Sequence, residues 1–207
     1  SQNINDKTKW VILNSPSNPT GTCYTESELI EISKVIENNP HVNVMTDDIY
    51  EHLVYDDFIF KTIAEVNQNI IDQTLIINGV SKAYAMTGWR IGYAAGEKQL
   101  IKAMGKLQSQ STSNPSSISQ AAAVEALSGD QSFLKDRAEV FKKRRDFVVS
   151  ALNAMDGITC LKPEGAFYVF PNCTGLIGKQ TKNGKKLSND EDVVTALLED
   201  AGVAVVQ

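Results

Sequence analysis

Short apolar runs alternate with segments of helical periodicity over the first hundred residues of the chain. The run KWVILNSP is brief, contains β-branched side chains and is closed by a proline-bearing turn, which is typical of a buried strand. Three later runs have the same character, and one of them, HVNVMTDD, ends in two acidic residues. The pattern therefore predicts four strands, at residues 9–16, 41–48, 74–82 and 90–96.

Helical periodicity fills the intervals between these runs. After the turn-forming stretch SNPTG, Leu29 and Ile36 fall on one face of a predicted amphipathic helix. Thr25 and Glu28 form the Thr-x-x-Glu pattern of a capping box at its start. Further helices are predicted over EKQLIKAMGKLQSQ, SISQAAAVEAL and the long stretch from Asp130 to Met155.

The C-terminal part of the chain follows a different order. GITCLKPEGAFYVFPNC predicts two short strands around Pro163 and Gly165, and TKNGKK predicts an exposed turn. NDEDVVTALLEDAG predicts a helix that is capped by Asn189 or Asp190 and closed by Gly202. The apolar run VAVV after it is predicted to be a final strand.

Together the two patterns indicate an α/β fold with two domains. Strands that alternate with helices predict a mostly parallel sheet, and the later part predicts a smaller α+β arrangement. We place the boundary inside the long predicted helix, which divides the chain into residues 1–140 and 141–207. Ligands collect beyond the carboxyl ends of parallel strands, so functional residues are expected there.

Composition limits the possible partners. The net charge of −5 and the pI near 5.1 argue against a nucleic-acid surface, and the basic run FKKRRDF is interpreted as a solvated helix face. Cys23, Cys160 and Cys173 show no CxxC spacing, so neither a disulfide framework nor a metal site is predicted, and a cytoplasmic location is expected. No apolar run approaches the ~18 residues of a membrane helix, so no membrane partner is expected.

Five polar residues stand at or close after the ends of the predicted strands. Taken singly, each has an ordinary structural explanation. Asn18 lies in a turn-forming sequence, and Asp47 could cap a helix beside a packed Tyr50. Lys82 could extend from a strand end into water, and Arg90 could form a surface salt bridge. Their order, and their place on successive strand ends, favour one shared site instead.

The five residue types match the needs of a pyridoxal phosphate site. That cofactor requires an amine for a Schiff base, a carboxylate at the ring nitrogen, a donor to the ring hydroxyl and a cation for the phosphate. Lys82 supplies the amine and Asp47 the carboxylate. Tyr50 and Asn18 are suitable partners for the ring oxygen. Arg90 offers a bidentate fork for phosphate that a lysine would not reproduce.

The motifs that carry these residues resemble the class I aminotransferases, which are fold-type-I pyridoxal phosphate enzymes. SPSNPTG, DDIYEHLVYDD, NGVSKAYAMTGWRIGY, QSQSTSNPSSISQ and PEGAFYVF are most similar to the bacterial aspartate aminotransferases, and the similarity runs through essentially the whole chain. The resemblance implies that Lys82 is the Schiff-base lysine and that Asp47 pairs with the pyridine nitrogen. It also implies that Tyr50 and Asn18 hold the ring oxygen, with Asn18 near the substrate carboxylate, and that Arg90 binds phosphate.

The same resemblance implies the rest of the architecture. Residues 1–140 would be the C-terminal part of a large cofactor-binding domain, and residues 141–207 part of a small C-terminal domain. Both ends are expected to be truncated, so the chain alone would not form a complete active site. The family forms homodimers with shared active sites, and the sequence QSQSTSNP is expected near that interface.

Two positions depart from the family pattern. Gly79 stands three residues before Lys82, where many relatives have a phosphate-binding serine. Ser109 stands five residues before Asn114, where some relatives have an arginine that reads the distal carboxylate of a dicarboxylic substrate. The reader of that carboxylate must therefore come from elsewhere, or the substrate differs.

The expected activity is ping-pong transamination through a Schiff base to Lys82, with aspartate and 2-oxoglutarate as the first expected substrates and prephenate as a secondary acceptor in similar enzymes. Other cofactor chemistry in the same fold, such as β-elimination or decarboxylation, is an open alternative. A non-catalytic module that senses the cofactor is another.

Overall fold

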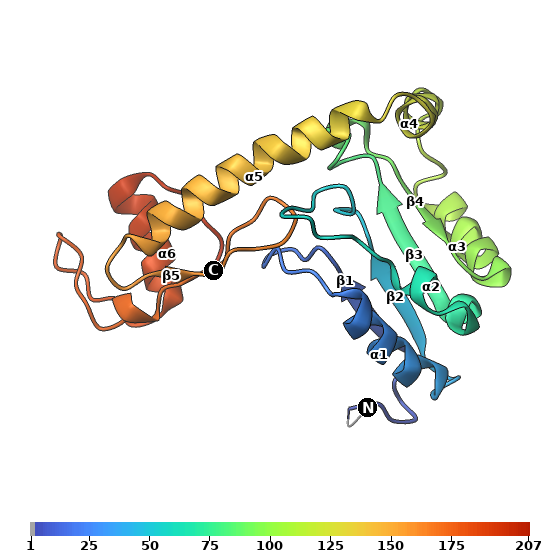
Figure 1. Ribbon diagram of the computed structural model, residues 1–207, viewed down its shortest axis with the longest axis horizontal. Helices are drawn as coiled ribbons and strands as arrows, with labels where there is room; N and C mark the ends of the chain where they lie inside the picture. Colours follow the sequence, from blue (N-terminus) through green and yellow to red (C-terminus); the bar gives the residue numbers. More distant parts are fainter. Residues whose placement is uncertain (1–2) are drawn as a thin grey trace. The chain divides into compact units, whose positions relative to one another are not determined.

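The computed structural model describes residues 3–207, and their contacts divide the chain into two units (Figure 1). The first unit comprises the described residues up to Lys142 together with Pro163–Tyr168. The second unit comprises Lys143–Lys162 and Val169–Gln207. The assignment of residues 1–140 and 141–207 to parts of a large and a small domain stays a prediction.

A four-stranded sheet organises the first unit, in the order β1-β2-β3-β4. The first three strands run parallel and β4 runs antiparallel to β3, which confirms the four predicted strands and the mostly parallel sheet. Asn14 pairs with Asp47, and Asp47 with Ile77, so the carboxyl ends of the parallel strands lie in register. The strands are β1 (Trp10–Asn14), β2 (Asn43–Asp47), β3 (Thr74–Gly79) and β4 (Gly92–Ala95).

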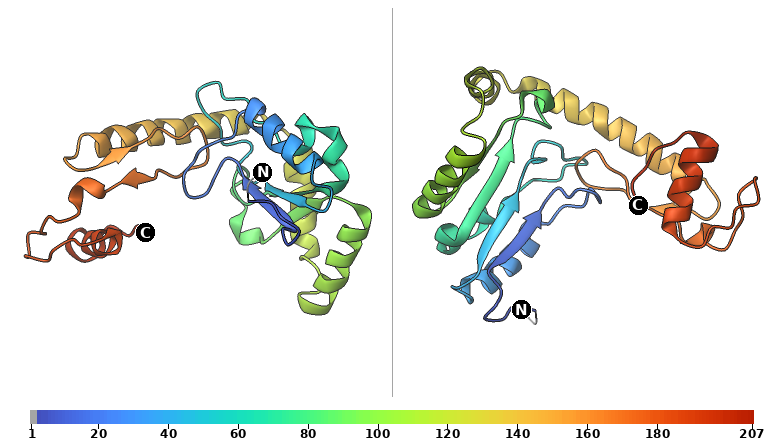
Figure 2. Two further views of the ribbon diagram at one scale, coloured as in Figure 1. Left: turned by 90° about the horizontal axis from the view of Figure 1, so that it is seen from below. Right: turned by 180° about the vertical axis from the view of Figure 1, so that it is seen from behind.

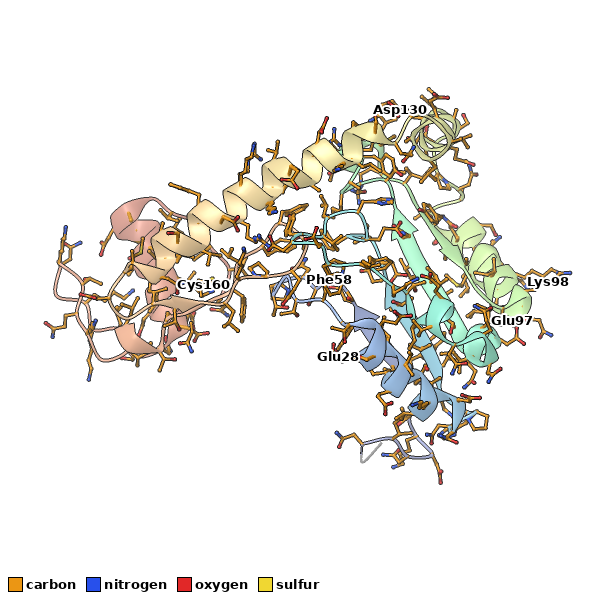
Figure 3. The ribbon with its side chains drawn as sticks, in the orientation of Figure 1. Glu28, Phe58, Glu97, Lys98, Asp130 and Cys160 are labelled. Carbon is orange, nitrogen blue, oxygen red and sulfur yellow. The ribbon has the colours of Figure 1, made fainter. Side chains whose placement is uncertain are left out.

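Helix α1 (Glu26–Glu37), the short helix α2 (Ile63–Val66) and the 3-10 helix η1 (Gln68–Gln73) cover one face of the sheet next to β1 and β2 (Figure 2). Their apolar side chains enclose the main core with those of the two strands, as the amphipathic pattern of α1 predicts. The fully formed capping box at Thr25 and Glu28 is confirmed, and Glu28 lies in the first turn of α1 (Figure 3). The buried core residues are Leu13, Leu29, Ile36, Val42, Val44, Ile63 and Ile70.

The opposite face of the sheet is more open in this chain. Side chains alternate along a strand, so Trp10 and Ile12 point away from the face that carries Leu13. Ile12 is 66% exposed, and Tyr93 on β4 is also exposed. Strands that are apolar on both faces are typical of parallel sheets covered on both sides.

The remaining elements of the first unit are mostly helical. The predicted helices after residue 97 are present as α3 (Lys98–Ser111), α4 (Ser117–Ser128) and α5 (Ser132–Asn153). The short 3-10 helix η2 (Thr87–Trp89) precedes β4. Helix α5 continues from the first unit into the second. In the described part of the chain, no helix has both the length and the apolar character needed to cross a bilayer.

The second unit contains two very short antiparallel strands and one further long helix. The strands, β5 (Thr159–Cys160) and β6 (Pro171–Asn172), are the two predicted around Pro163 and Gly165. The 3-10 helix η3 (Thr174–Leu176) follows, and then α6 (Asp190–Ala201). Asn189 caps α6 and Gly202 closes it in the left-handed conformation, as predicted.

One prediction about the later part of the chain is wrong, and another holds only in part. The run VAVV after α6 is not a strand, because Val203 N–H binds Leu197 O and completes the helix C-cap, and the residues after it find no strand to pair with in the described chain. The basic run FKKRRDF is not wholly solvated either. Arg145 shares a helix face with the buried Val149, is itself buried, and pairs with Asp146 at 2.8 Å.

Candidate active site

Asn14 joins the carboxyl ends of β1 and β2 to the loop that follows β1. Its side-chain amide donates to Asp47 O at 3.0 Å, and its side-chain oxygen accepts from Asn18 N at 2.7 Å. The loop also contains cis peptide bonds at Ser15–Pro16 and Asn18–Pro19. Asn14 was not singled out from the sequence, although its place at the end of a predicted strand was a usable signal.

Asp47 and Asp48 are adjacent acids in different environments. Asp48 is buried and accepts a hydrogen bond from the Thr46 hydroxyl at 2.6 Å, and burial raises the pKa of its carboxyl to about 6. The Asp47 carboxylate is half-buried and accepts from Ile49 N at 3.3 Å. Of the two, Asp47 is therefore the carboxylate with room for a ligand.

Tyr50 is buried three residues after Asp47, with its hydroxyl 2.5 Å from the hydroxyl of Tyr168. Burial is the largest cause that raises its pKa above the ordinary value, and the hydrogen bond with Tyr168 is the next. A hydrogen bond from the Asn18 side chain acts in the opposite direction. Asn18 is an exposed residue, and its side chain lies beside the Tyr50 hydroxyl.

Lys82 follows the end of β3 and extends over two aromatic rings. Its Nζ lies 5.7 Å from the centre of the Tyr50 ring and 5.8 Å from that of Phe167. The backbone after Lys82 is held from α5, because Arg137 Nη1 donates to Ala83 O at 2.6 Å. A cation at this distance from aromatic faces is attracted by them, so the amine is held above Tyr50.

Arg90 ends the same loop in the left-handed backbone conformation, with φ of 53°. Its guanidinium is exposed and donates to Thr87 O at 3.0 Å, while the Thr87 hydroxyl donates to Ser81 O at 3.1 Å. In the described contacts, Arg90 is joined to the Lys82 loop through these two bonds. The structure thus gathers Asn18, Asp47, Tyr50 and Lys82, and it places Arg90 at the far end of the loop that begins with Lys82.

Two surface hollows lie away from these five residues. A hollow of about 650 Å³ in the second unit is lined by residues of β5, β6 and the end of α5, and one of about 320 Å³ in the first unit lies between β4 and α4. Neither hollow is lined by any of the five candidate residues. The position of the candidate site is therefore defined by the contacts of these five side chains. Across residues 3–207, no cluster of three or more His, Cys, Asp or Glu side chains could hold a metal ion.

A family model described as aminotransferase class I and II matches residues 1–207. The chain belongs to this family. It is 59% identical over 203 residues to the aspartate/prephenate aminotransferase of Cereibacter sphaeroides and 56% identical to the aspartate aminotransferase of Rhizobium meliloti. Each of these two matches covers 98% of this chain. It covers 51% and 50% of those proteins, so the chain spans about half the length of the curated relatives that it matches.

Solved aminotransferase structures have the same fold. The crystal structure of the Rhizobium meliloti aspartate aminotransferase matches with a TM-score of 0.95 at 56% identity, over 98% of this chain and 51% of that one. The Thermus thermophilus aspartate aminotransferase with maleate matches with a TM-score of 0.86 at 36% identity, over 99% of this chain and 50% of that one. The fold-type-I aminotransferase fold is therefore confirmed for this chain.

The aminotransferase motif PEGAFYVF contributes residues whose positions the sequence did not reveal. Its PEGAFY portion belongs to the first unit, where the Phe167 and Tyr168 rings pack against Tyr50 with centroid distances of 5.4 and 5.7 Å. The motif itself was the available signal, but nothing in it indicates that two of its side chains meet Tyr50 across more than a hundred residues.

The departure at Gly79 has a structural reason. Gly79 and Gly92 are directly paired across β3 and β4. A Cβ built on Gly79 would lie 3.2 Å from Gly92 Cα and 3.2 Å from Ile91 O, which is tighter than ordinary packing. The close approach of these two strands therefore disfavours a serine at position 79 in this chain.

Proposed function

We propose that this chain carries the cofactor-binding half of a pyridoxal-phosphate-dependent aminotransferase that transfers an amino group between aspartate and 2-oxoglutarate. The observation that carries the proposal is the position of Lys82 Nζ, 5.7 Å from the Tyr50 ring, in a member of the aminotransferase family. Asn18 reaches the same tyrosine, and Asp47 ends the neighbouring strand.

The side chains present fit the cofactor. Asp47 is an acid with room for a ring nitrogen, Tyr50 and Asn18 form a pair suited to a ring oxygen, and Arg90 offers an exposed guanidinium to a phosphate. When bound, the cofactor supplies an electrophilic carbon and a ring that accepts electron density from the substrate. The chain supplies the groups around it.

Each side chain has a distinct role in the proposal. Lys82 would hold the cofactor through its amine, and the same amine, once free, would take a proton from the substrate Cα. Asp47 would hold the ring nitrogen in its protonated form, which would stabilise negative charge that develops during that proton transfer. A cofactor that carries the amino group from the first substrate to the second would give the ping-pong order of the two half-reactions.

The substrate assignment rests on the names of the relatives. Aspartate appears in the names of both curated relatives, and prephenate appears in one, so prephenate is a second amino acceptor to test. Maleate, with which the Thermus protein was crystallised, is a dicarboxylate like aspartate. Ser109 stands where some relatives read the distal carboxylate with an arginine, so either another residue reads that carboxylate or the substrate differs.

We further propose that the full-length protein acts as a homodimer and that this chain alone is inactive. Leu107 on α3 and Ile118 and Val124 on α4 are largely exposed in this chain, and they flank the QSQSTSNP segment. Exposed apolar side chains on both sides of this segment support an interface there. A cytoplasmic location remains an expectation.

The test uses the full-length protein with Lys82→Ala, Lys82→Arg and the surface control Lys34→Ala, incubated with pyridoxal phosphate and aspartate. Both Lys82 variants should lose at least about a thousandfold in rate, since neither retains a primary amine that can bond to the cofactor and move the proton. Lys34→Ala should react like the natural protein. Normal turnover in either Lys82 variant would refute the assignment.

The same incubation separates transamination from lyase or decarboxylase chemistry. An aminotransferase should convert the bound cofactor to its amine form with one equivalent of 2-oxo acid in the absence of an acceptor. A lyase would release product repeatedly and leave the cofactor unchanged. A protein that binds the cofactor but turns over no amino acid would instead support a sensing module.

A further inference from the structure

The contact between the Tyr50 and Tyr168 hydroxyls is a feature that the proposed roles leave unused. The two oxygens lie 2.5 Å apart, although 118 residues separate them in the sequence. Both residues belong to the first unit. A hydroxyl has one proton to donate and two positions that accept, so one tyrosine of the pair donates and the other accepts.

The backbone that carries Tyr168 is fixed from both sides. Ala166 N donates to Leu53 O at 2.8 Å, and Ala166 O accepts from the Tyr55 hydroxyl. Gly165 lies so close to Pro16 that a Cβ there would stand 2.6 Å from Pro16 Cγ. Ala166 has φ of 58°, a conformation that a non-glycine residue keeps only when its surroundings enforce it. Tyr168 is therefore held in place by its backbone as well as by its hydroxyl.

Ring packing places Tyr168 independently of its oxygen. Its ring meets the Tyr50 ring edge-on at 5.7 Å and an interplanar angle of 78°. The centre of the neighbouring Phe167 ring lies 4.9 Å from that of Tyr168. Replacing Tyr168 by phenylalanine keeps these apolar contacts, so that variant removes the hydroxyl and little else.

The Tyr50 oxygen has a second partner in the Asn18 side chain, whose amide N–H can donate to it, and this hydrogen bond lowers the pKa of Tyr50. We propose that Tyr168 is a positioning residue whose hydroxyl donates to Tyr50 Oη, so that Asn18 and Tyr168 fill both accepting positions and the Tyr50 proton is directed at an anionic oxygen of a bound ligand. This inference rests on the proposed function, in which that oxygen belongs to the pyridoxal phosphate ring.

The direction of the Tyr50–Tyr168 bond depends on what else the site offers. Without an anion, either of the two hydroxyls can donate to the other. An anionic oxygen is a stronger acceptor than a neutral hydroxyl. Its arrival turns the Tyr50 proton towards the ligand, and Tyr168 then becomes the donor.

The first experiment uses the full-length protein loaded with pyridoxal phosphate and follows the pH midpoint of the bound cofactor's absorbance. Loss of a donor leaves more negative charge on the ring oxygen, so the nearby Lys82 nitrogen should keep its proton to higher pH. Tyr168→Phe should raise the midpoint by about 0.5–1 pH unit, and Tyr50→Phe should raise it further. Tyr84→Phe, which removes a hydroxyl bound to Gln131, is the matched control and should not shift it.

The double variant Tyr50→Phe, Tyr168→Phe tests whether Tyr168 acts through Tyr50. Its midpoint should equal that of Tyr50→Phe alone, because residues that share one network are not additive. A Tyr168→Phe midpoint equal to that of Tyr84→Phe would overturn the proposal. So would a further shift when Tyr168→Phe is added to Tyr50→Phe.

A second measurement needs no cofactor. In protein with ¹³C-labelled tyrosine rings, the Tyr50 resonance, identified by its loss in Tyr50→Phe, should move in Tyr168→Phe and stay in place in Tyr84→Phe. An unmoved resonance in Tyr168→Phe would overturn the pairing of the two hydroxyls. If the natural protein gave no cofactor spectrum, the proposed function would fail, while this resonance would still decide whether Tyr168 acts on Tyr50.

Discussion

The two units of the chain differ in how completely they bury their apolar side chains. The largest side chains that are less than 2% exposed, among them Ile36, Val44 and Ile63, all belong to the first unit. The buried apolar residues of the second unit, such as Leu187 and Val193, keep 6–8% of their surface exposed. All five candidate site residues are in the first unit, so their positions depend on the tightly packed core and the strand ends that it fixes.

The largest expected effect contrasts one leucine from each unit. Leu29→Ala removes a side chain packed between α1 and the sheet, and should lower the free energy of unfolding by about 2–5 kcal/mol. Leu187→Ala should lower it by less than about 2 kcal/mol, because its more open surroundings can relax around the gap. Urea unfolding of the full-length variants measures both.

Equal losses in the two leucine variants would contradict the contrast. They would mean that, in the full-length protein, residues outside this chain pack against Leu187 and bury it more completely.

A smaller effect concerns Asp48, a polar group inside the packed unit. Its pKa is raised to about 6 by burial, so the folded state holds its proton more tightly than the unfolded chain does. The stability that this proton gives is present below about pH 4 and is lost as the pH rises through about 6. Asp48→Asn should therefore match the natural protein near pH 4 and exceed it at pH 8 by up to roughly 3 kcal/mol. Urea midpoints at the two pH values check this, and a constant difference between the proteins would count against it.

The smallest effect compares helix caps, which depend on local chemistry. Thr25 accepts from Glu28 N at the start of α1, and Asn189 accepts from Asp192 N at the start of α6. Thr25→Ala and Asn189→Ala should each cost about 1 kcal/mol, with little difference between the units. Thermal unfolding followed by circular dichroism would measure both. A much larger loss for Thr25→Ala would show that the units differ in more than packing.

Local patterns predicted the elements whose causes are local. The capping box at Thr25, the strands that end at Asn14 and Asp47, and the caps of α6 all depend on residues within a few positions of each other. The run VAVV failed as a strand because pairing needs a partner that periodicity cannot supply.

Long-range contacts explain what the sequence did not reveal of the candidate site. The five candidate residues came from motif order and family resemblance, and their roles remain proposals. The bond between Tyr50 and Tyr168 and the bridge from Asn14 to Asp47 join segments 118 and 33 residues apart. Sequence periodicity describes which face of an element a side chain takes, but not which distant element will meet it.

The separation between Tyr50 and Tyr168 also has a consequence for biosynthesis. At a translation rate of about 5–20 residues per second, the ribosome needs roughly 6–24 seconds to add the 118 residues that separate them. During that interval the nascent sheet can assemble, while Tyr50 still lacks the aromatic neighbours that will enclose it. The candidate site is thus completed late in synthesis, after the sheet that supports it.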